Sequence, residues 1–261
     1  MNNKEIIKPW NLELESKPDF ELCMKRIYAW YEGQIIDRAP VRFSAHNSDY
    51  DHADEIKGSK WKNLKERWMD EVYHVEKFMK IAKSKKWLGE TFPVYWPNLG
   101  PNVFASFYDC PMEFGEVTSW LEPVLKDYKN MGQLKFNPEN GYFKQIDKMT
   151  DYALERCEGQ FMVGYTDLHP GIDCAAAWRN TEDLCMDFYD NYEELKALVA
   201  IASKDFNQVF DHYDKKLKSK NQLSVTWMNI PSFGKMHIPS ADFSAMISRT
   251  QFDETCLPII Q

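Results

Sequence analysis

Four short apolar segments, separated by long amphipathic stretches, constrain the fold of this chain more than any other feature of its sequence. The apolar segments span residues 39–43, 91–96, 160–165 and 223–228, and each has the length and composition of a β-strand. Strands that alternate with long helices are typical of parallel α/β proteins, because a crossover must carry the chain back before the next parallel strand begins. In such folds ligands bind beyond the carboxyl ends of the strands.

Apolar residues spaced three and four apart predict the helices. In the clearest case Trp61, Leu64, Trp68 and Val72 begin a stripe that continues to Ala82. Segment 103–136 shows no pattern that assigns it. The predicted helices cover residues 18–33, 61–86 and 140–156, then 181–218 as one helix or a pair, and 252 to the end. The predicted helix caps are Asp19 and Thr181, together with capping boxes at Ser119/Glu122 and Ser248/Gln251.

Composition excludes several classes of protein. The chain has 261 residues, 44% of them hydrophobic, which is enough for a sizeable core. Its formal net charge of −8 argues against sequence-independent binding to nucleic acid or to an anionic membrane surface. No apolar run approaches the roughly 20 residues of a membrane-spanning helix. Aromatic residues make up 15% of the chain, and they fill either a core or a deep pocket.

Cysteine and glycine usage narrows the choice further. The six cysteines are scattered, with no CxxC pair, which predicts free thiols in a reducing cytoplasm. The first residues, 1–5, do not resemble a signal peptide. No glycine-rich phosphate-binding loop follows a predicted strand, and the chain has only 11 glycines, so a Rossmann nucleotide-binding unit is not expected.

Polar residues that can carry chemistry follow all four predicted strands. Histidines and carboxylates there are suited to general acid–base catalysis, whereas amides beside tryptophans are suited to binding a small polar ligand. Turn formation and helix capping are the alternative roles of the acidic residues, and solvent exposure is the alternative for the histidine after the first strand. No HExxH or Cys/His spacing indicates a metal site, so no metal ligand is predicted. The predicted catalytic residues are Asp167, His169, His237 and Asp242, and the predicted substrate-binding residues are His46, Asn47, Trp96, Asn98, Tyr165, Trp227 and Asn229.

Several segments resemble the uroporphyrinogen decarboxylase superfamily. Residues 26–33, followed by Asp37-Arg38-Ala39-Pro40-Val41, are similar to the helix and the "DR-x-PV" entry into the first barrel strand of that family. Residues 173–180, 240–248 and 252–258 are similar to three later segments of the family, in the same order. The resemblance implies a TIM-type (β/α)8 barrel over residues 39–261, preceded by an N-terminal arm and helix over residues 1–38.

The resemblance also implies a choice between two reactions. The superfamily contains cofactor-free decarboxylases of a tetrapyrrole and corrinoid-linked methyltransferases that use zinc. The decarboxylases carry an arginine-rich loop after the first strand, whereas here residues 43–50 contain no arginine beyond the preceding Arg42, and Asp49, Asp51 and Asp54 would repel a polyanion. We therefore expect a methyltransferase-like cytoplasmic enzyme that acts on a small molecule, with a thiol or a corrinoid protein as its partner. Uroporphyrinogen decarboxylation (a lyase reaction) and an inactive or merely binding fragment are the alternatives.

Zinc and a corrinoid enter these expectations only through the resemblance. The zinc ligands of the methyltransferases include a His-x-Cys pair, but here Ile238 and Pro239 follow His237.

A closed barrel needs eight strands, whereas four are predicted, and residues 258–261 end inside a predicted helix without a capping signal. We therefore expect the chain to be the first two-thirds of a longer family member, with the closing strands and any zinc ligands in the missing part.

Overall fold

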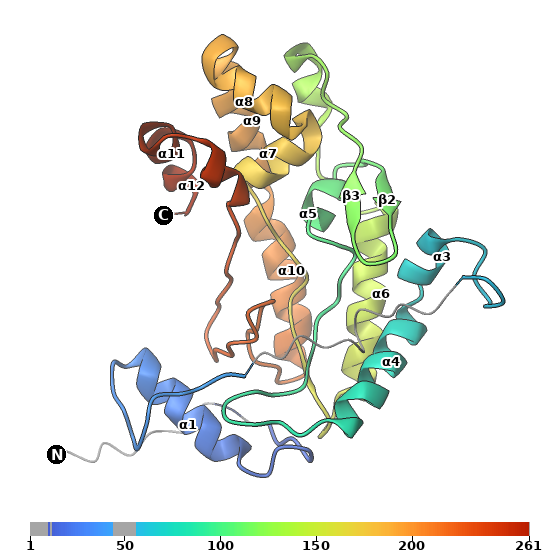
Figure 1. Ribbon diagram of the computed structural model, residues 1–261, viewed down its shortest axis with the longest axis vertical. Coiled ribbons are helices and arrows are strands. Elements are labelled where there is room, and N and C mark those ends of the chain that lie inside the picture. Colours follow the sequence, from blue (N-terminus) through green and yellow to red (C-terminus); the bar gives the residue numbers. More distant parts are fainter. Residues whose placement is uncertain (1–9, 11, 44–55, 261) are drawn as a thin grey trace.

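A computed structural model describes residue 10, residues 12–43 and residues 56–260, which form a mixed α/β structure dominated by helices (Figure 1). Short strands lie between the long helices, and α1 lies at the opposite end of the molecule from α7, α8 and α9. In chain order the elements are α1 (Phe20–Tyr31), α3 (Leu64–Trp68), α4 (Glu71–Ser84), β1 (Val94–Tyr95), α5 (Val103–Ser106), β2 (Met112–Phe114), β3 (Ser119–Leu121), the 3₁₀ helix η1 (Tyr128–Gln133), α6 (Gly141–Arg156), β4 (Met162–Val163), α7 (Ile172–Arg179), α8 (Thr181–Asp190), α9 (Tyr192–Lys204), α10 (Phe206–Ser219), the 3₁₀ helix η2 (Asp242–Met246), α11 (Arg249–Thr255) and α12 (Leu257–Ile260).

The predicted second and third strands form a parallel pair. In β1 and β4, Val94 lies opposite Met162 and Tyr95 lies opposite Val163. Beyond β4 the Tyr165 amide donates to the Val225 carbonyl at 2.9 Å, so the predicted fourth strand lies along the other side of β4. These three segments run side by side and bring their carboxyl ends to one edge, as the sequence pattern predicts.

A glycine allows this close approach. A Cβ atom on Gly164 would lie 2.8 Å from the Val225 carbonyl oxygen, so any larger residue would push the segment that contains Val225 away from β4.

The first and fourth predicted strands are otherwise weakly paired. Arg42 and Ser224 each form an isolated bridge, to Gly89 and Ser232.

Two of the predicted helices are divided. The expected helix 61–86 consists of α3 and α4, because the Asp70 carboxylate accepts the Tyr73 amide and starts a new helix. The expected helix 181–218 consists of α8, α9 and α10. Asn180, rather than Thr181, caps α8, with its side-chain oxygen accepting the Asp183 amide.

Segment 103–136 contains α5, the β2–β3 hairpin and η1. The capping box predicted at Ser119 is wrong, because Ser119 begins β3 and its hydroxyl donates to the Leu99 carbonyl at 2.5 Å. The capping box at Ser248 and Gln251 is confirmed at the start of α11. Helix α7 was not predicted, since its small apolar residues have no clear helical stripe.

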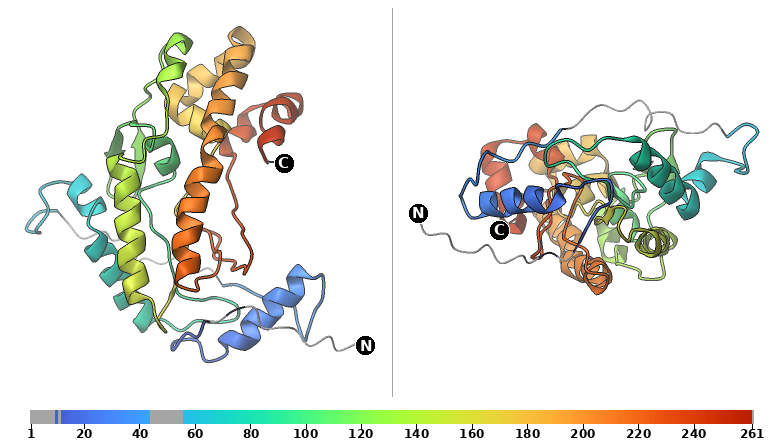
Figure 2. Two further views of the ribbon diagram at one scale, coloured as in Figure 1. Left: turned by 180° about the vertical axis from the view of Figure 1, so that it is seen from behind. Right: turned by 90° about the horizontal axis from the view of Figure 1, so that it is seen from below.

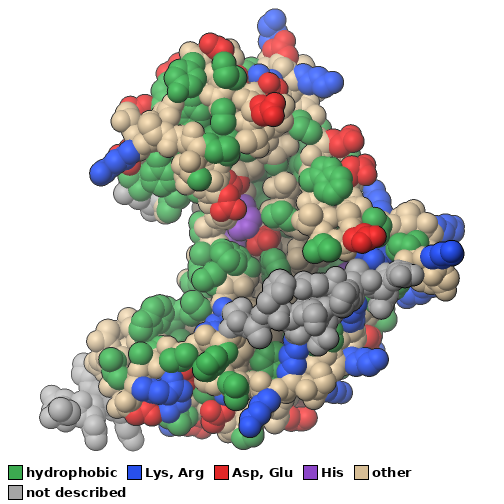
Figure 3. Space-filling model, viewed as in Figure 1, with side chains coloured by type: hydrophobic (Ala, Val, Ile, Leu, Met, Phe, Trp, Pro, Cys, Tyr) green, Lys and Arg blue, Asp and Glu red, His purple; other side chains and the backbone are tan. Residues whose placement is uncertain are grey.

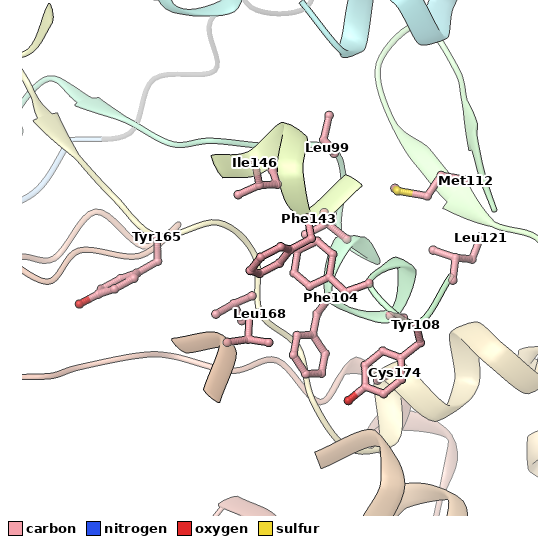
Figure 4. Close-up of a cluster of buried hydrophobic side chains, with 14 of the residues drawn as sticks. Leu99, Phe104, Tyr108, Met112, Leu121, Phe143, Ile146, Tyr165, Leu168 and Cys174 are labelled. Carbon is pink, nitrogen blue, oxygen red and sulfur yellow. The ribbon is translucent and has the colours of Figure 1, made fainter. Parts of the chain in front are cut away.

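One large core joins the long helices to the strand edge. Figure 2 shows α6 and α10 running alongside each other, with α4 packed on the other side of α6. Figure 4 shows part of the core, where side chains from α5, α6, α7 and the strand-end loops meet. Among these, Phe143 of α6 lies edge-on to Phe107 with ring centroids 5.2 Å apart, and both side chains are buried. The aromatic residues thus fill the core, although some also line the cavity described below.

The described residues form two two-stranded sheets, β1–β4 and β2–β3, and a closed barrel is not seen among them. The barrel therefore stays a prediction, as do its domain boundaries at residues 38 and 39. All six cysteines are free. None of the helices in the described part of the chain is long and apolar enough to cross a membrane.

A buried ion-pair network joins α1 to the strand entry. Glu90, which is 3% exposed, accepts from Arg26 at 3.1 Å, from Arg38 at 2.8 Å and from the Val41 amide. Burial by itself raises the pKa of Glu90, but the hydrogen bonds from Arg38, Val41 and Arg26 outweigh it and hold this pKa below its ordinary value. The DR-x-PV segment therefore has a structural role here, because it fixes α1 against the chain before β1.

We expect Glu90→Gln to lower the free energy of unfolding by about 2–3 kcal/mol, because the neutral amide leaves two guanidinium groups without their buried anion. Chemical denaturation at pH 7 measures this loss of stability.

Because the pKa of Glu90 in the folded protein is depressed, its stabilising effect is complete above the ordinary pKa of a glutamate. The effect is lost as the pH falls through the pKa of the folded state. The free energies of unfolding of the unsubstituted protein and of Glu90→Gln should therefore converge in strong acid. Glu21→Gln, in an exposed pair with Lys25, should change stability by less than about 0.5 kcal/mol; equal losses in the two variants would contradict the prediction.

Candidate functional site

The candidate site lies where three extended segments end. Trp96 follows β1 directly, Thr166 and Asp167 follow β4, and Thr226 follows the segment that pairs with Tyr165. Figure 3 shows a hollow in this face of the molecule, with a histidine and acidic side chains on its inner wall and hydrophobic side chains on either side. Polar groups are thus concentrated at the edge where an α/β fold binds its ligands.

Asp167 and His169 form the centre of the site. The Asp167 carboxylate is 5% exposed, and its Oδ1 atom lies 3.0 Å from Nε2 of His169. The Ser240 amide donates to Nδ1 of His169 at 2.9 Å. A neutral imidazole that accepts at Nδ1 carries its proton on Nε2, the nitrogen that lies within ion-pair distance of the carboxylate. The pair therefore places two groups that can take up and release a proton close together, without a hydrogen bond between them.

His237 lies beside this pair with the same tautomer. Its Nε2 atom donates to the Leu168 carbonyl at 2.8 Å, and its ring packs among Tyr165, Phe206 and Phe210. Burial lowers the pKa of His237 to about 4, so the ring is neutral at pH 7. Its Nδ1 atom is then a hydrogen-bond acceptor in an apolar surrounding.

Buried polar atoms without a hydrogen-bond partner cluster at this edge. In the part of the chain that the structure describes, four of them come from residues at the strand ends and the fifth from His237, which is bonded to the Leu168 carbonyl: Trp96 Nε1, Thr166 Oγ1, Asp167 Oδ1, Thr226 Oγ1 and His237 Nδ1. Although Asp167 Oδ1 lies within ion-pair distance of His169, it makes no hydrogen bond there. Each unsatisfied buried group costs about 1–3 kcal/mol. Such a cluster is typical of a site where a ligand or bound water supplies the missing partners.

The segment that carries Ser240 and Asp242 is fixed to α7 by a second carboxylate. The Asp173 carboxylate accepts hydrogen bonds from the backbone amides of Asp242 and Phe243, each with a nitrogen–oxygen distance of 2.9 Å. Asp242, predicted as catalytic, begins η2 and accepts the Ser240 hydroxyl at 2.6 Å. The structure thus brings Asp242 near the Asp167–His169 pair, in the turn-forming position that was its alternative role.

The predicted substrate-binding residues divide into three groups. Tyr165 is 1% exposed and donates a hydrogen bond to Asp214 at 2.6 Å, which places it in the core. His46 and Asn47 lie outside the described residues. The third group surrounds one cavity of about 720 Å³ and consists of Trp96, Asn98, Trp227 and Asn229. Within this group, the side chain of Asn98 also accepts a hydrogen bond from the Gly100 amide of its own loop.

Sequence reasoning missed several residues of this cavity and of the strand edge. Lys85, Lys86 and Trp87 precede β1 and line the same cavity, as does Arg67 of α3. Nothing in their local sequence distinguishes them from solvated residues at the end of a helix. Thr166 and Thr226 lie at strand ends, and this position could have identified them as site residues from the sequence.

The described residues do not fit a zinc site. No group of three or more His, Cys, Asp and Glu side chains in the described ranges is placed to hold a metal ion. Burial raises the pKa of the Cys110 thiol to about 12, and that of Cys174 well above its ordinary value, so neither is a ready thiolate ligand.

Comparison with known proteins gives one structural match. No protein-family model matches the chain, and no curated protein matches its sequence. The structure is similar to that of a methyltransferase from Methanosarcina mazei, with 12% sequence identity and a TM-score of 0.47. The match covers 80% of this chain but 57% of the other, so the chain spans less than two-thirds of the length of that protein. Similarity at this level determines neither the fold nor the reaction.

The neutral His237 makes a pH-dependent prediction. Between pH 6.5 and about 4 the unfolded chain binds a proton at this ring that the folded chain does not. The free energy of unfolding should therefore fall as the pH is lowered through that window, by at most about 1.4 kcal/mol per pH unit from this residue. His237→Gln should make the slope shallower, as measured by denaturation at several pH values. An NMR titration midpoint of the His237 ring above pH 6 would contradict the assignment.

Proposed function

We propose that this chain is the substrate-binding and acid–base part of a small-molecule methyltransferase. The observation that carries the site assignment is the cluster of buried, unpartnered polar atoms around Asp167 and His169 at the carboxyl edge of the strands. The reaction class comes from the resemblance of the sequence to the uroporphyrinogen decarboxylase superfamily. Methyl transfer between a small donor and a thiol, or a corrinoid carried by a partner protein, is the branch that we favour.

The chemistry required of the protein is proton transfer and positioning. Methyl transfer to a thiol forms a carbon–sulfur bond and breaks the bond between the methyl carbon and the donor heteroatom. The thiol gives up its proton, and the departing heteroatom takes one up. Asp167 accepts the proton, and His169, whose Nε2 atom lies 3.0 Å from the carboxylate, is the second group close enough to take it up. Nδ1 of the neutral His237 is free to accept a hydrogen bond from the substrate.

Zinc does not enter this scheme, because the described residues do not provide a site for it. A corrinoid would be presented by the partner protein, and it would supply the methyl-carrying cobalt. The contribution assigned to this chain is to bind the small substrate, exclude water and hold the proton at Asp167 and His169.

The test is a methyl-transfer assay with the purified chain. Methylcobalamin and 2-mercaptoethanol are incubated with the protein, and demethylation is followed by the change in visible absorbance. We expect protein-dependent demethylation that is lost in His169→Asn. No spectral change above the rate of the protein-free mixture, either with free methylcobalamin or with a methylated corrinoid protein, would overturn the methyltransferase proposal.

Uroporphyrinogen decarboxylation is measured with the same preparation. Its product, coproporphyrinogen, is oxidised and detected by fluorescence after chromatography. Formation of this product without methyl transfer would assign the chain to the other branch of the superfamily. Absence of both reactions, with a native melting transition, would favour a binding role.

A further inference from the structure

Asp167 is an exception among the buried carboxylates. The described residues contain four of these, Glu90, Asp167, Asp187 and Asp214. Glu90 and Asp187 form ion pairs with arginines, and Asp214 accepts a hydrogen bond from the Tyr165 hydroxyl. Asp167, by contrast, has a buried Oδ1 atom without a hydrogen-bond partner. Because burial of an unpaired carboxylate costs free energy, this oxygen calls for a partner that the described chain does not supply.

No cation of the described chain offsets the charge of Asp167. Its ion-pair contact is with His169, and no lysine or arginine among the described residues lies within ion-pair distance of it. The imidazole of His169 accepts the Ser240 amide at Nδ1 and is therefore neutral in this arrangement. Residues 44–55, which lie outside the described part of the chain, contain neither lysine nor arginine. The strand edge thus carries a negative charge that needs a positive partner.

A second acceptor lies close to this carboxylate. Nε2 of His237 donates to the carbonyl of Leu168, the residue after Asp167, and Nδ1 of the same ring is buried without a hydrogen-bond partner. Burial is the main cause of the low pKa of His237, but Asp167 raises this pKa and His169 lowers it, so the three groups lie within electrostatic reach of one another. The ring packs among aromatic side chains, and an ion pair in such an apolar surrounding is stronger than one in water.

The unpartnered atoms determine which hydrogen bonds a ligand must make. Oδ1 of Asp167 and Nδ1 of His237 accept hydrogen bonds, whereas the buried hydroxyls of Thr166 and Thr226 can accept or donate. A water molecule can donate to these atoms, but it leaves the negative charge of the carboxylate without compensation. A primary ammonium group has three N–H donors, no acceptor and a positive charge, so it meets both requirements. A metal ion is not indicated, since the described residues provide no group of three or more potential ligands.

We propose that the carboxyl edge of the strands binds the primary ammonium group of a small molecule, with Asp167 as its counter-ion and His237 as a second acceptor. The inference rests on the proposed function in taking this edge as the place where the small substrate binds, and it assigns that substrate to the amines. The hollow in Figure 3, with acidic side chains beside a histidine on its inner wall, opens this face of the molecule to solvent.

The test is an NMR titration of the full chain at pH 7. The probe is n-butylamine, and two analogues separate the features of its ammonium group. 1-Butanol has an O–H donor but no charge, whereas butyltrimethylammonium has the charge but no N–H donor. We expect n-butylamine to bind at least about tenfold more tightly than either analogue, because it alone provides charged N–H donors. Equal binding of n-butylamine and 1-butanol, or no binding of n-butylamine, would overturn the inference.

The imidazole resonances in the same titration locate the bound amine. We expect the rings of His169 and His237 to shift, whereas the ring of His74, which is bonded to the Arg67 carbonyl, should not. His74 lines the cavity of about 720 Å³. A shift of its ring without shifts of His169 and His237 would therefore place the amine in that cavity and contradict the inference.

Asp167→Asn tests the counter-ion directly. The amide keeps the shape of the side chain but has no charge, so binding of n-butylamine should weaken at least about tenfold. Asp190→Asn makes the same change at an exposed position at the end of α8, and it should alter the affinity by less than about twofold. Equal affinities in the two variants would overturn the inference. Melting temperatures show whether each variant is folded, and the three ligands decide the question with the unsubstituted protein if Asp167→Asn is not.

The outcomes separate this inference from the proposed function. Asp167-dependent binding of n-butylamine by a protein without methyl-transfer activity would support the amine site and contradict the methyltransferase proposal. Methyl transfer by a protein that does not bind n-butylamine would contradict the amine site and support the proposed function. Inhibition of methyl transfer over the concentrations at which n-butylamine binds would support both.

Discussion

Asp167→Asn is expected to lower the rate of methyl transfer about 10³-fold while the melting temperature stays within about 2 °C. The amide has nearly the same shape as the carboxylate and can still pack at this buried position, but it cannot take up and release a proton. General acid–base groups typically contribute 10²- to 10⁴-fold to a rate, which sets the expected size. The measurement is kcat/KM in the methylcobalamin–thiol assay, with thermal unfolding of the same samples.

Asp190→Asn is the matched control for this prediction. Asp190 is an exposed residue at the end of α8, so the same change of charge there should alter activity by less than about twofold. If Asp167→Asn retained activity within threefold of the unsubstituted protein, Asp167 would not be a catalytic residue. The unpartnered Oδ1 atom would then have to be explained by bound water alone.

Trp178→Ala is expected to cause the largest loss of stability, about 4 kcal/mol. Trp178 of α7 is completely buried, and its ring lies edge-on to Tyr108 with centroids 4.7 Å apart. Its indole donates to the Ala105 carbonyl at 3.0 Å, so the substitution leaves both a cavity and an unpaired carbonyl. Losses of 3–5 kcal/mol are typical of such substitutions. Denaturant unfolding at pH 7 measures the change.

Trp178→Phe and Trp30→Ala are the controls. Phenylalanine keeps most of the buried ring, so its cost should be about half that of alanine. Trp30 of α1 is 51% exposed, and replacing it with alanine should cost less than about 1 kcal/mol. A loss below about 1.5 kcal/mol in Trp178→Ala would mean that the core around α7 relaxes to fill the space.

The elements with strong local patterns could be predicted from the sequence. Helix α6 has a wide apolar stripe and an Asn140 cap, and it lies within one residue of its predicted start. Strands β1 and β4 are apolar on both faces, as expected for strands buried between layers of helices. Helix α7 was missed because Ala175, Ala176 and Ala177 give no amphipathic signal, although they pack closely against the rest of the core.

The candidate site was predictable in part for a similar reason. Asp167, His169 and Trp96 were selected because they follow predicted strands, and that position alone places them at one edge of a parallel arrangement. Tyr165 was selected by the same rule, but it lies one residue too early and points into the core, where it is bonded to Asp214. A one-residue difference reverses the face of an extended chain, and periodicity cannot resolve the exact end of so short a strand.

The sequence by itself determined that this is an α/β chain, with apolar segments and helices in the observed order and with acid–base groups at the strand ends. Those features depend on the spacing of residues that are neighbours along the chain, where local geometry is regular. Only the tertiary structure decided which donors remain unpartnered and which charges meet in the cavity. Arg42, Arg67 and Lys85 come from three separate segments, and the packing that brings them to one cavity depends on contacts across the whole core.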